Sequence, residues 1–186
     1  MSSDAEVRLT PMDGDARGRR QVHLVGFMGC GKSTVGPLLA RRLLWSFLDL
    51  DALIVRHAGR PVAELFAEEG EQEFRRIETF VLRQAAQKPH TVVALGGGAH
   101  LAVENRELST QTATSVWLRC SFAEVQRRVN AAESNERGVR PLWTDPLAAR
   151  SLFEQREAIY AGADLVVDAE APPDEVAAEI EAQLRA

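Results

Sequence analysis

Gly26-Phe27-Met28-Gly29-Cys30-Gly31-Lys32-Ser33-Thr34 decides the fold of this chain, because it matches the phosphate-binding pattern G-x-x-x-x-G-K-[ST]. Glycines suit such a loop because backbone N–H groups must converge on phosphate oxygens without Cβ atoms in the way. Lys32 would reach the terminal phosphates, and the hydroxyl of Ser33 would face Mg²⁺. The stretch therefore predicts a site for a nucleoside triphosphate.

The sequence around the loop supplies the strand and the helix that such a site requires. Residues 21–25 (QVHLV) read as a short buried strand that runs into the loop, and residues 34–44 carry apolar side chains at helical spacing. A match this short also occurs by chance in unrelated loops, but strand, loop and helix in this order argue against chance. We expect the nucleotide phosphates to contact the following loop residues: Gly29, Cys30, Gly31, Lys32, Ser33 and Thr34.

The composition indicates one ordinary globular domain. The chain has 186 residues, of which 45% are hydrophobic and 26% charged. A net charge of -5 gives no general attraction to nucleic acid or to an acidic membrane, so local Arg and Lys must hold any anionic substrate. No apolar run resembles a signal peptide or a membrane span, and two cysteines form neither a disulfide framework nor a zinc site. We expect a cytoplasmic monomer with a disordered tail over residues 1–19 and one domain over residues 20–186.

Strand-like and helix-like patterns alternate along the rest of the chain. Strands are expected at residues 21–25, 46–51, 91–95, 113–120 and 165–167, and helices at residues 34–44, 51–57, 61–69, 71–87, 103–108, 122–130, 147–160 and 172–184. The alternation predicts a five-stranded parallel sheet with helices on both faces, an α/β fold of three layers (α/β/α) of the P-loop, nucleoside monophosphate kinase-like type. Ligands of such sheets bind at the carboxyl ends of the strands.

Two polar or flexible stretches follow predicted strands. Asp49 and Asp51 lie two residues apart, so on a strand both would face one side, where a P-loop needs an acid near Mg²⁺. Alternatively, these acids cap the next helix or face water. Gly96-Gly97-Gly98 would let a ligand approach the backbone closely, or would form a flexible turn.

Residues 131–146 (AAESNERGVRPLWTDP) interrupt the periodic pattern with a polar loop. A loop of this length inside a compact domain is typical of a functional lid or of a disordered segment. Because it has too little apolar surface to hold itself closed, we expect bound ligands to close it.

The ordered motifs resemble those of the shikimate kinase family, from about Val22 to Leu184. The resemblance rests on residues 26–34, 47–51 (FLDLD), 70–78 (GEQEFRRIE), 96–98, 140–142 (RPL), and Arg156 with Tyr160. A P-loop alone would indicate only a superfamily, whereas five further motifs in order are far more specific. The resemblance implies transfer of the γ-phosphate of ATP to the 3-hydroxyl of shikimate, on the route to chorismate and the aromatic amino acids.

The resemblance also implies roles on the substrate side of the site. Asp51 would bind the shikimate hydroxyls and accept or orient the proton of the attacking one. Arg75 and Arg156 would hold the carboxylate, with backbone contacts from Gly97 and Gly98. Because Glu71 and Arg75 are four residues apart, an ordinary surface ion pair is the alternative for Arg75.

On the nucleotide side, the resemblance implies that Asp49 and Ser33 act on Mg²⁺ and that Arg128 lies against adenine. Arg140 would swing in with the lid and meet the phosphates. The catalytic residues would be Lys32, Asp51 and Arg140. The segment before Arg140 is longer than expected for the family, so Arg137 is the alternative lid cation, although Pro-Leu after Arg140 favours the latter.

The side chain of Cys30 has two interpretations. It lies at a helix N-terminus, where positive backbone potential lowers a thiol pKa and would make the thiol reactive. A buried, unreactive thiol is the alternative.

Three other functions would leave different motifs in the sequence. A kinase acting on gluconate or a nucleoside monophosphate would keep the P-loop and lid, but need not keep Asp51, Arg75, Gly97 and Arg156 together. A GTPase-like switch would show an Asn-Lys-x-Asp motif, which the sequence lacks. A catalytically silent nucleotide-binding regulator would have lost Lys32 or the paired acids.

Overall fold

Five parallel strands form the middle layer of the protein, in the order β2-β3-β1-β4-β5. The structure is a computed structural model and describes residues 12–15, 17–133 and 145–186. The strands are β1 Gln21–Val25, β2 Ser46–Asp49, β3 Thr91–Ala94, β4 Thr114–Arg119 and β5 Leu165–Asp168. The helices are α1 Lys32–Leu43, α2 Leu50–Ala58, α3 Val62–Ala85, α4 Val103–Thr112, α5 Phe122–Glu133, α6 Pro146–Tyr160 and α7 Pro173–Arg185, with a short 3-10 helix η1 at Ala99–Leu101.

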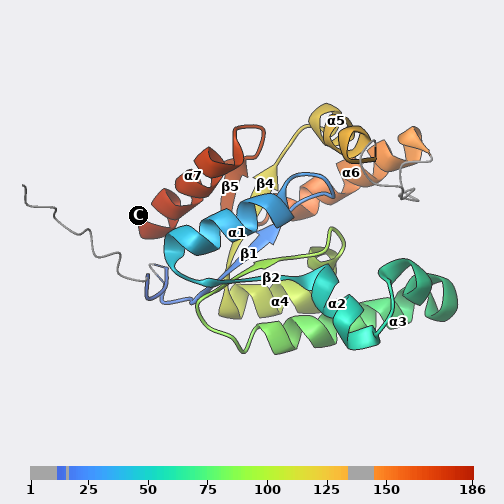
Figure 1. The fold of residues 1–186 in the computed structure, drawn as a ribbon, viewed down its shortest axis with the longest axis horizontal. Helices are drawn as coiled ribbons and strands as arrows, with labels where there is room; N and C mark the ends of the chain where they lie inside the picture. The colour runs from blue at the N-terminus through green and yellow to red at the C-terminus, as the bar shows by residue number, and fades with distance from the viewer. Residues whose placement is uncertain (1–11, 16, 134–144) are drawn as a thin grey trace, which may run out of the picture.

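Helices cover both faces of the sheet. Helices α1 and α7 pack together on one face, and α3 and α4 lie on the other (Figure 1). Strand β1 is central, with β3 and β4 as its parallel neighbours, and all five of its residues are buried. Burial on both faces suits the apolar residues of this strand, and its two buried polar side chains, Gln21 and His23, are hydrogen-bonded to Ala85 O and to the Ser109 hydroxyl. The predicted five-stranded, three-layer α/β/α sandwich is confirmed.

The order of the elements follows the prediction, with one error that matters for the site. Strand β2 ends at Asp49 and α2 begins at Leu50, so Asp51 lies in the first turn of a helix and not on the strand. The prediction that Asp49 and Asp51 share a strand face is therefore wrong. The two helices expected on either side of Gly70 form one element, α3, which is kinked at Gly70 (φ 80, ψ 175).

Part of the segment assigned to the N-terminal tail packs on the domain. The indole Nε1 of Trp45 donates to the carbonyl O of Met12 at 2.8 Å, and Met12 is buried. Nε of Arg19 donates to Oδ2 of Asp15 at 2.9 Å, while its Nη1 donates to Oδ1 of Asp164 at 3.1 Å. Met12 and Arg19 thus contact the domain, and the boundary at residue 20 stays a prediction.

The predicted lid falls largely outside the described residues. Residues 131–133 belong to α5, and α6 begins at Pro146 after Asp145, whose side chain caps the helix through Leu147 N and Ala148 N. Residues 134–144, with Arg137 and Arg140, lie outside the described residues. In the part of the chain that the structure describes, no helix is long and apolar enough to cross a membrane.

Candidate active site

The P-loop connects the carboxyl end of β1 to the N-terminus of α1. Gly29 (φ 80) and Gly31 (φ 105) adopt left-handed conformations that other residues rarely adopt, and Gly31 is the N-cap of α1. The helix starts with bonds from Thr34 N and Val35 N to the carbonyl O of Gly31, at 3.0 and 2.8 Å. The loop therefore leads directly into the positive N-terminal end of α1, the position at which phosphate groups commonly bind.

Lys32 lies inside the curve of this loop. Its Nζ donates to the carbonyl oxygens of Gly26 and Phe27 at 2.7 and 2.9 Å, and the residue is buried. These neutral acceptors hold the ammonium next to the loop without cancelling its charge. An anion that enters the loop would therefore meet a full positive charge.

Asp49 both caps a helix and faces the P-loop. Its Oδ1 accepts a bond from Ala52 N at 3.2 Å, and its Oδ2 accepts one from the Ser33 hydroxyl at 2.8 Å. The two interpretations of this acid are thus compatible, because each uses a different oxygen. A carboxylate oxygen and a hydroxyl oxygen side by side are the kind of ligand that Mg²⁺ prefers.

Each glycine of Gly96-Gly97-Gly98 leaves room for a charged side chain from a different part of the chain. An added Cβ would lie 2.7 Å from Asp51 Oδ1 at Gly96, 3.4 Å from Arg156 Nη1 at Gly97, and 2.6 Å from Arg75 Nη1 at Gly98. None of the three glycines has a left-handed φ, so small size and not conformational freedom is what Gly96 and Gly98 require, while a Cβ at Gly97 would make only an ordinary contact. The structure thus brings three candidate substrate residues to one short segment after β3.

Arg75 forms the ion pair expected on its helix and a second, more buried one. Its Nη2 lies 3.2 Å from Oε1 of Glu71, which is the surface alternative considered above. Its Nη1 donates to Oε2 of Glu78 at 2.8 Å, and the Glu78 side chain is only 1% exposed. The guanidinium is therefore held against Gly98 by a buried carboxylate, which a simple surface pair would not provide.

Glu78 is a site residue that the sequence reasoning did not single out. Burial raises its pKa, while the hydrogen bond and charge of Arg75 oppose that rise. The available signal was its position three residues after Arg75 in the quoted motif GEQEFRRIE, where one helix face can carry both. Glu78 is not one of the apolar residues at helical spacing in this part of α3 (Phe74, Ile77, Val81 and Ala85), and a charged residue outside that set is usually exposed.

Arg156 approaches Gly97 from α6 on the other side. Its guanidinium lies over the ring of Phe27, with Cζ 5.6 Å from the centroid. Its Nε is buried and makes no hydrogen bond with the described residues. Tyr160, one turn later, donates its hydroxyl to the carbonyl O of Gly97 at 2.5 Å. This helix therefore fixes the glycine segment and brings to it a cation whose buried Nε has no hydrogen-bond partner among the described residues.

Asp51 lies between the P-loop cation and the two arginines. The side chain reaches solvent at the mouth of the site, but the surrounding protein removes enough water to raise its pKa above that of an ordinary aspartate. The charge of Asp49 adds to the rise, and Lys32 and Arg75 oppose it. The raised pKa makes Asp51 a better proton acceptor than an ordinary aspartate.

Arg128 lies on the other side of the P-loop. Its Nη1 donates to the carbonyl O of Cys30 at 3.1 Å and its Nη2 to the carbonyl O of Ala169 at 2.7 Å. It thus contacts the loop that would hold the phosphates. Its predicted contact with adenine stays a prediction.

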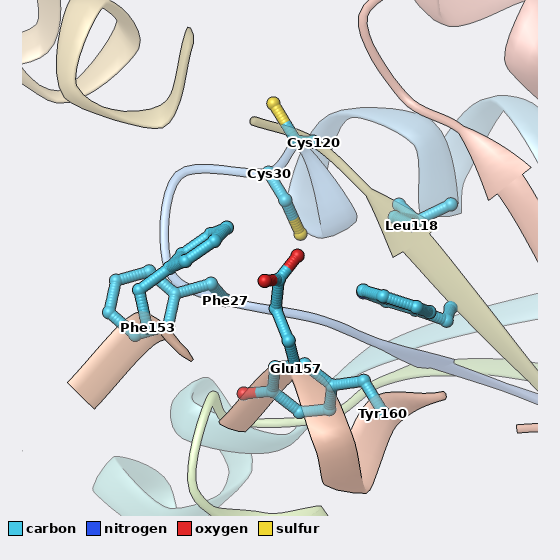
Figure 2. A pocket seen from close by; sticks show the side chains of 8 residues that line it. Phe27, Cys30, Leu118, Cys120, Phe153, Glu157 and Tyr160 are labelled. Carbon is cyan, nitrogen blue, oxygen red and sulfur yellow. The ribbon is translucent and has the colours of Figure 1, made fainter. Parts of the chain in front are cut away.

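The side chain of Cys30, which belongs to the P-loop, lines a narrow crevice. The crevice is too narrow for a water molecule and is lined by Phe27, Cys30, Trp117, Leu118, Cys120, Phe153, Glu157 and Tyr160. Figure 2 shows the Glu157 carboxylate pointing toward Sγ of Cys30. Both cysteines are free and buried, and burial raises the pKa of Cys120 to about 11. The buried alternative for Cys30 is favoured, because the residue is only 1% exposed.

Comparison with known proteins agrees with this geometry. The family model for shikimate kinase matches residues 28–185. A shikimate kinase of Geobacter sulfurreducens is 44% identical over 158 residues, which cover 85% of this chain and 83% of that protein. One of Salinibacter ruber is 39% identical over 171 residues, covering 86% of this chain and 82% of that protein.

Solved structures lead to the same family. Shikimate kinase from Acinetobacter baumannii in complex with shikimate has a TM-score of 0.81 and 31% identity, over 89% of this chain and 92% of that one. A gluconokinase from Sinorhizobium meliloti has a TM-score of 0.59 at 19% identity, over 88% of this chain and 90% of that one, and shares the fold alone. With the family model spanning most of the chain and relatives this similar, the protein belongs to the shikimate kinase family.

Proposed function

We propose that this protein transfers the γ-phosphate of ATP to the 3-hydroxyl of shikimate, giving shikimate 3-phosphate and ADP. Membership of the family makes it an ATP-dependent phosphotransferase with an alcohol group as acceptor. The observation that carries the choice of substrate is the convergence of Asp51, Arg75 and Arg156 on Gly96-Gly97-Gly98, beside the P-loop. Two cations at this place suit an acceptor that carries a carboxylate and argue against an uncharged sugar, while gluconate, which also carries a carboxylate, is distinguished by the assay below.

The two arginines suit a small carboxylic acid. Guanidinium groups bind carboxylates through pairs of parallel N–H···O bonds, which fix both position and orientation. Arg75 is held by Glu78, and Arg156 has a buried Nε without a partner among the described residues. Backbone groups of Gly97 and Gly98 would add contacts, since neither residue has a side chain to keep a ligand away from its backbone.

Asp51 would align the acceptor hydroxyl and take up its proton. Phosphoryl transfer needs little covalent help from the protein and depends on alignment and on positive charge around the transferring group. Lys32 would supply charge from the P-loop side, and Arg140 would supply it from the lid. Asp51 supplies the alignment, because its carboxylate lies against Gly96, at the glycine segment that the two arginines also approach.

The residues present fit a magnesium ion. Ser33 and Asp49 offer two oxygen donors 2.8 Å apart, and we propose that they would hold the ion, Asp49 acting through water. When bound with ATP, the ion would neutralise charge on the β and γ phosphates. Among the described residues no group of three or more His, Cys, Asp or Glu could hold a metal, which suits an ion held largely by phosphate and water.

Further parts of the proposal concern the nucleotide and the setting of the enzyme. Arg128 would lie against adenine, together with the loop contacts of residues 29–34. We propose a monomer in the cytoplasm, where a reducing environment would keep Cys30 and Cys120 as thiols.

An assay of ADP release tests the proposed activity. The purified protein would be given ATP, Mg²⁺ and one acceptor at a time: shikimate, quinate, gluconate or a nucleoside monophosphate. We expect turnover with shikimate, and a loss of that turnover in Arg156→Ala through a raised KM for shikimate. Turnover of another acceptor with none of shikimate would show that the substrate assignment is wrong.

A further inference from the structure

A network centred on Arg128 joins three segments that are distant in sequence. Nε of Arg128 donates to Oε1 of Glu124 at 2.6 Å. Its Nη1 and Nη2 donate to the carbonyl oxygens of Cys30 in the P-loop and Ala169 after β5, as described above. The guanidinium therefore ties α5 to the P-loop and to the segment that follows β5.

Glu124 is the member of this network that holds the guanidinium from its own helix. It lies one turn before Arg128 on α5, so the helix presents both side chains on one face. The Glu124 and Arg128 side chains are 17% and 25% exposed, whereas Arg127, which also binds Glu124, is 69% exposed. The bond to Arg128 is therefore better shielded from solvent than the bond to Arg127.

Glu124 carries a full negative charge under ordinary conditions. Hydrogen bonds from Arg127 and then Arg128 lower its pKa to about 2. The carboxylate therefore holds Arg128 throughout the pH range in which the enzyme would work. A neutral side chain at this position would keep the shape and lose the charge-assisted bond.

Arg128 needs such support because it lies where an anion would bind. A Cβ on Gly31, the N-cap of α1, would be 3.5 Å from Nη1 of Arg128. An arginine held at this point adds positive charge to the N-terminus of the helix. An arginine free to change rotamer would have to be ordered again for each binding event, at a cost in affinity.

We propose that Glu124 is a positioning residue for the nucleotide: it fixes Arg128 against the P-loop and the segment after β5, and through Arg128 it sets the affinity for a nucleoside phosphate. The inference rests on the proposed function and adds to it a residue that touches neither substrate. Glu124 acts on nucleotide binding and not on the acceptor, because Arg128 contacts Cys30 and Ala169 and not the glycine segment that holds Asp51.

Binding of ADP in the absence of shikimate tests this role. Calorimetry would compare wild type, Glu124→Gln and the matched control Arg127→Ala, which removes the exposed partner of the same carboxylate. We expect Glu124→Gln to weaken ADP binding and raise KM for ATP about tenfold, the loss of one charge-assisted bond, with little change in kcat or in KM for shikimate. Arg127→Ala should leave all four constants close to wild type.

A double-mutant cycle tests whether Glu124 acts through Arg128. If it does, Glu124→Gln has no further effect on ADP binding in an Arg128→Ala background. Full additivity of the two losses would overturn the inference, as would unchanged ADP affinity in Glu124→Gln. Circular dichroism and the melting temperature would verify that each variant is folded.

The same measurements separate this inference from the proposed function. A wild-type protein that binds ADP but does not phosphorylate shikimate would refute the substrate assignment and leave the role of Glu124 standing. Normal shikimate turnover with equal ADP affinity in wild type and Glu124→Gln would refute the role of Glu124 alone.

Discussion

Gly98→Ala should impair shikimate binding without disturbing the fold. The φ of Gly98 is -103°, so alanine can adopt the backbone conformation found here. Its Cβ, however, would lie 2.6 Å from both Nη1 and Nη2 of Arg75. The clash is with the far end of a long side chain, so the guanidinium moves and the backbone need not.

The size of the effect follows from this displacement. Carbon and nitrogen atoms pack comfortably at about 3.5 Å, so the guanidinium must shift by about 1 Å. That shift moves it away from the place where it would meet the carboxylate, and it strains the 2.8 Å bond to Glu78. Losing a charge-assisted bond costs about 1.5–3 kcal/mol, which corresponds to a rise in KM for shikimate of about 10- to 100-fold.

Steady-state kinetics with each substrate varied in turn would measure this. Gly97→Ala is the matched comparison, because its Cβ would lie at an ordinary 3.4 Å from Arg156 Nη1, and it should raise KM for shikimate less. Gly162→Ala, whose Cβ would meet only Ile159 O at 3.4 Å, controls for the exchange itself. Equal KM values for shikimate in Gly98→Ala and Gly162→Ala would refute the reasoning, as would a rise confined to KM for ATP.

Four further outcomes are expected. Asp51→Asn should lower kcat at least about 100-fold, with a smaller change in KM, because it removes the base that aligns the acceptor hydroxyl; steady-state kinetics measure it. Arg140→Ala should lower kcat by orders of magnitude and Arg137→Ala much less, since a lid cation at the transferring phosphate acts mainly in the transition state. Cys30→Ala should stay active, and thiol reagents should react slowly with the native protein, because Cys30 is buried. Acid should destabilise the fold through His23 and His100, because burial lowers the pKa of His23 from 6.5 to about 3 and that of His100 from 6.5 to about 4. Below pH 6.5 the unfolded chain takes up protons that the folded one does not, so His23 alone should account for about 2 kcal/mol of the stability lost between pH 7 and pH 5, as measured by chemical denaturation.

Each of these has a result that would contradict it. Near wild-type kcat in Asp51→Asn would leave the proton acceptor unassigned, and a large loss confined to Arg137→Ala would move the lid role to that residue. Fast loss of activity with a thiol reagent, prevented by ATP, would show that the Cys30 thiol is accessible. For the acid effect, His23→Gln should have a flatter pH dependence of unfolding than the exposed-site control His57→Gln, and equal curves would exclude His23 as the cause.

Local patterns were sufficient to predict the order of strands and helices. The run over residues 21–25, the glycines of the P-loop and the apolar spacing after it are short-range signals, and each appears in the structure where expected. The glycine break in α3 is equally local, since Gly70 alone adopts a non-helical conformation there. The three-layer sandwich follows from the alternation of these elements.

The position of Asp51 could not be derived from alternation. The segment Phe47-Leu48-Asp49-Leu50-Asp51 alternates apolar and acidic residues, which suits a strand. Asp49 can equally begin a helix, because its side chain accepts the bond from Ala52 N. In the structure Asp49 is the N-cap of α2, so Asp51 extends into the site from the first turn of that helix.

The sequence alone also could not show which side chains lie against the three glycines. The structure shows three protein side chains near these glycines, two of them at distances that a Cβ would not allow, and the close approach of a ligand stays a prediction. They come from α2, α3 and α6, and no local pattern reports contacts between segments so far apart. Glu78 was missed for the same reason, because its burial depends on packing against Gly96 and on its bond to Arg75.

The two arginines differ in what they can offer a substrate carboxylate. Arg75 already has two carboxylate partners, Glu71 and Glu78, so much of its charge is balanced before any substrate arrives. Arg156 forms no ion pair with the described residues, and its buried Nε lacks a hydrogen bond. A substrate carboxylate would therefore gain most of its electrostatic stabilisation from Arg156, because that charge is the less compensated one. Arg75, held in place by a buried acid, is suited to setting the orientation of the acid, which is why a displacement of about 1 Å at Gly98 should be felt in binding.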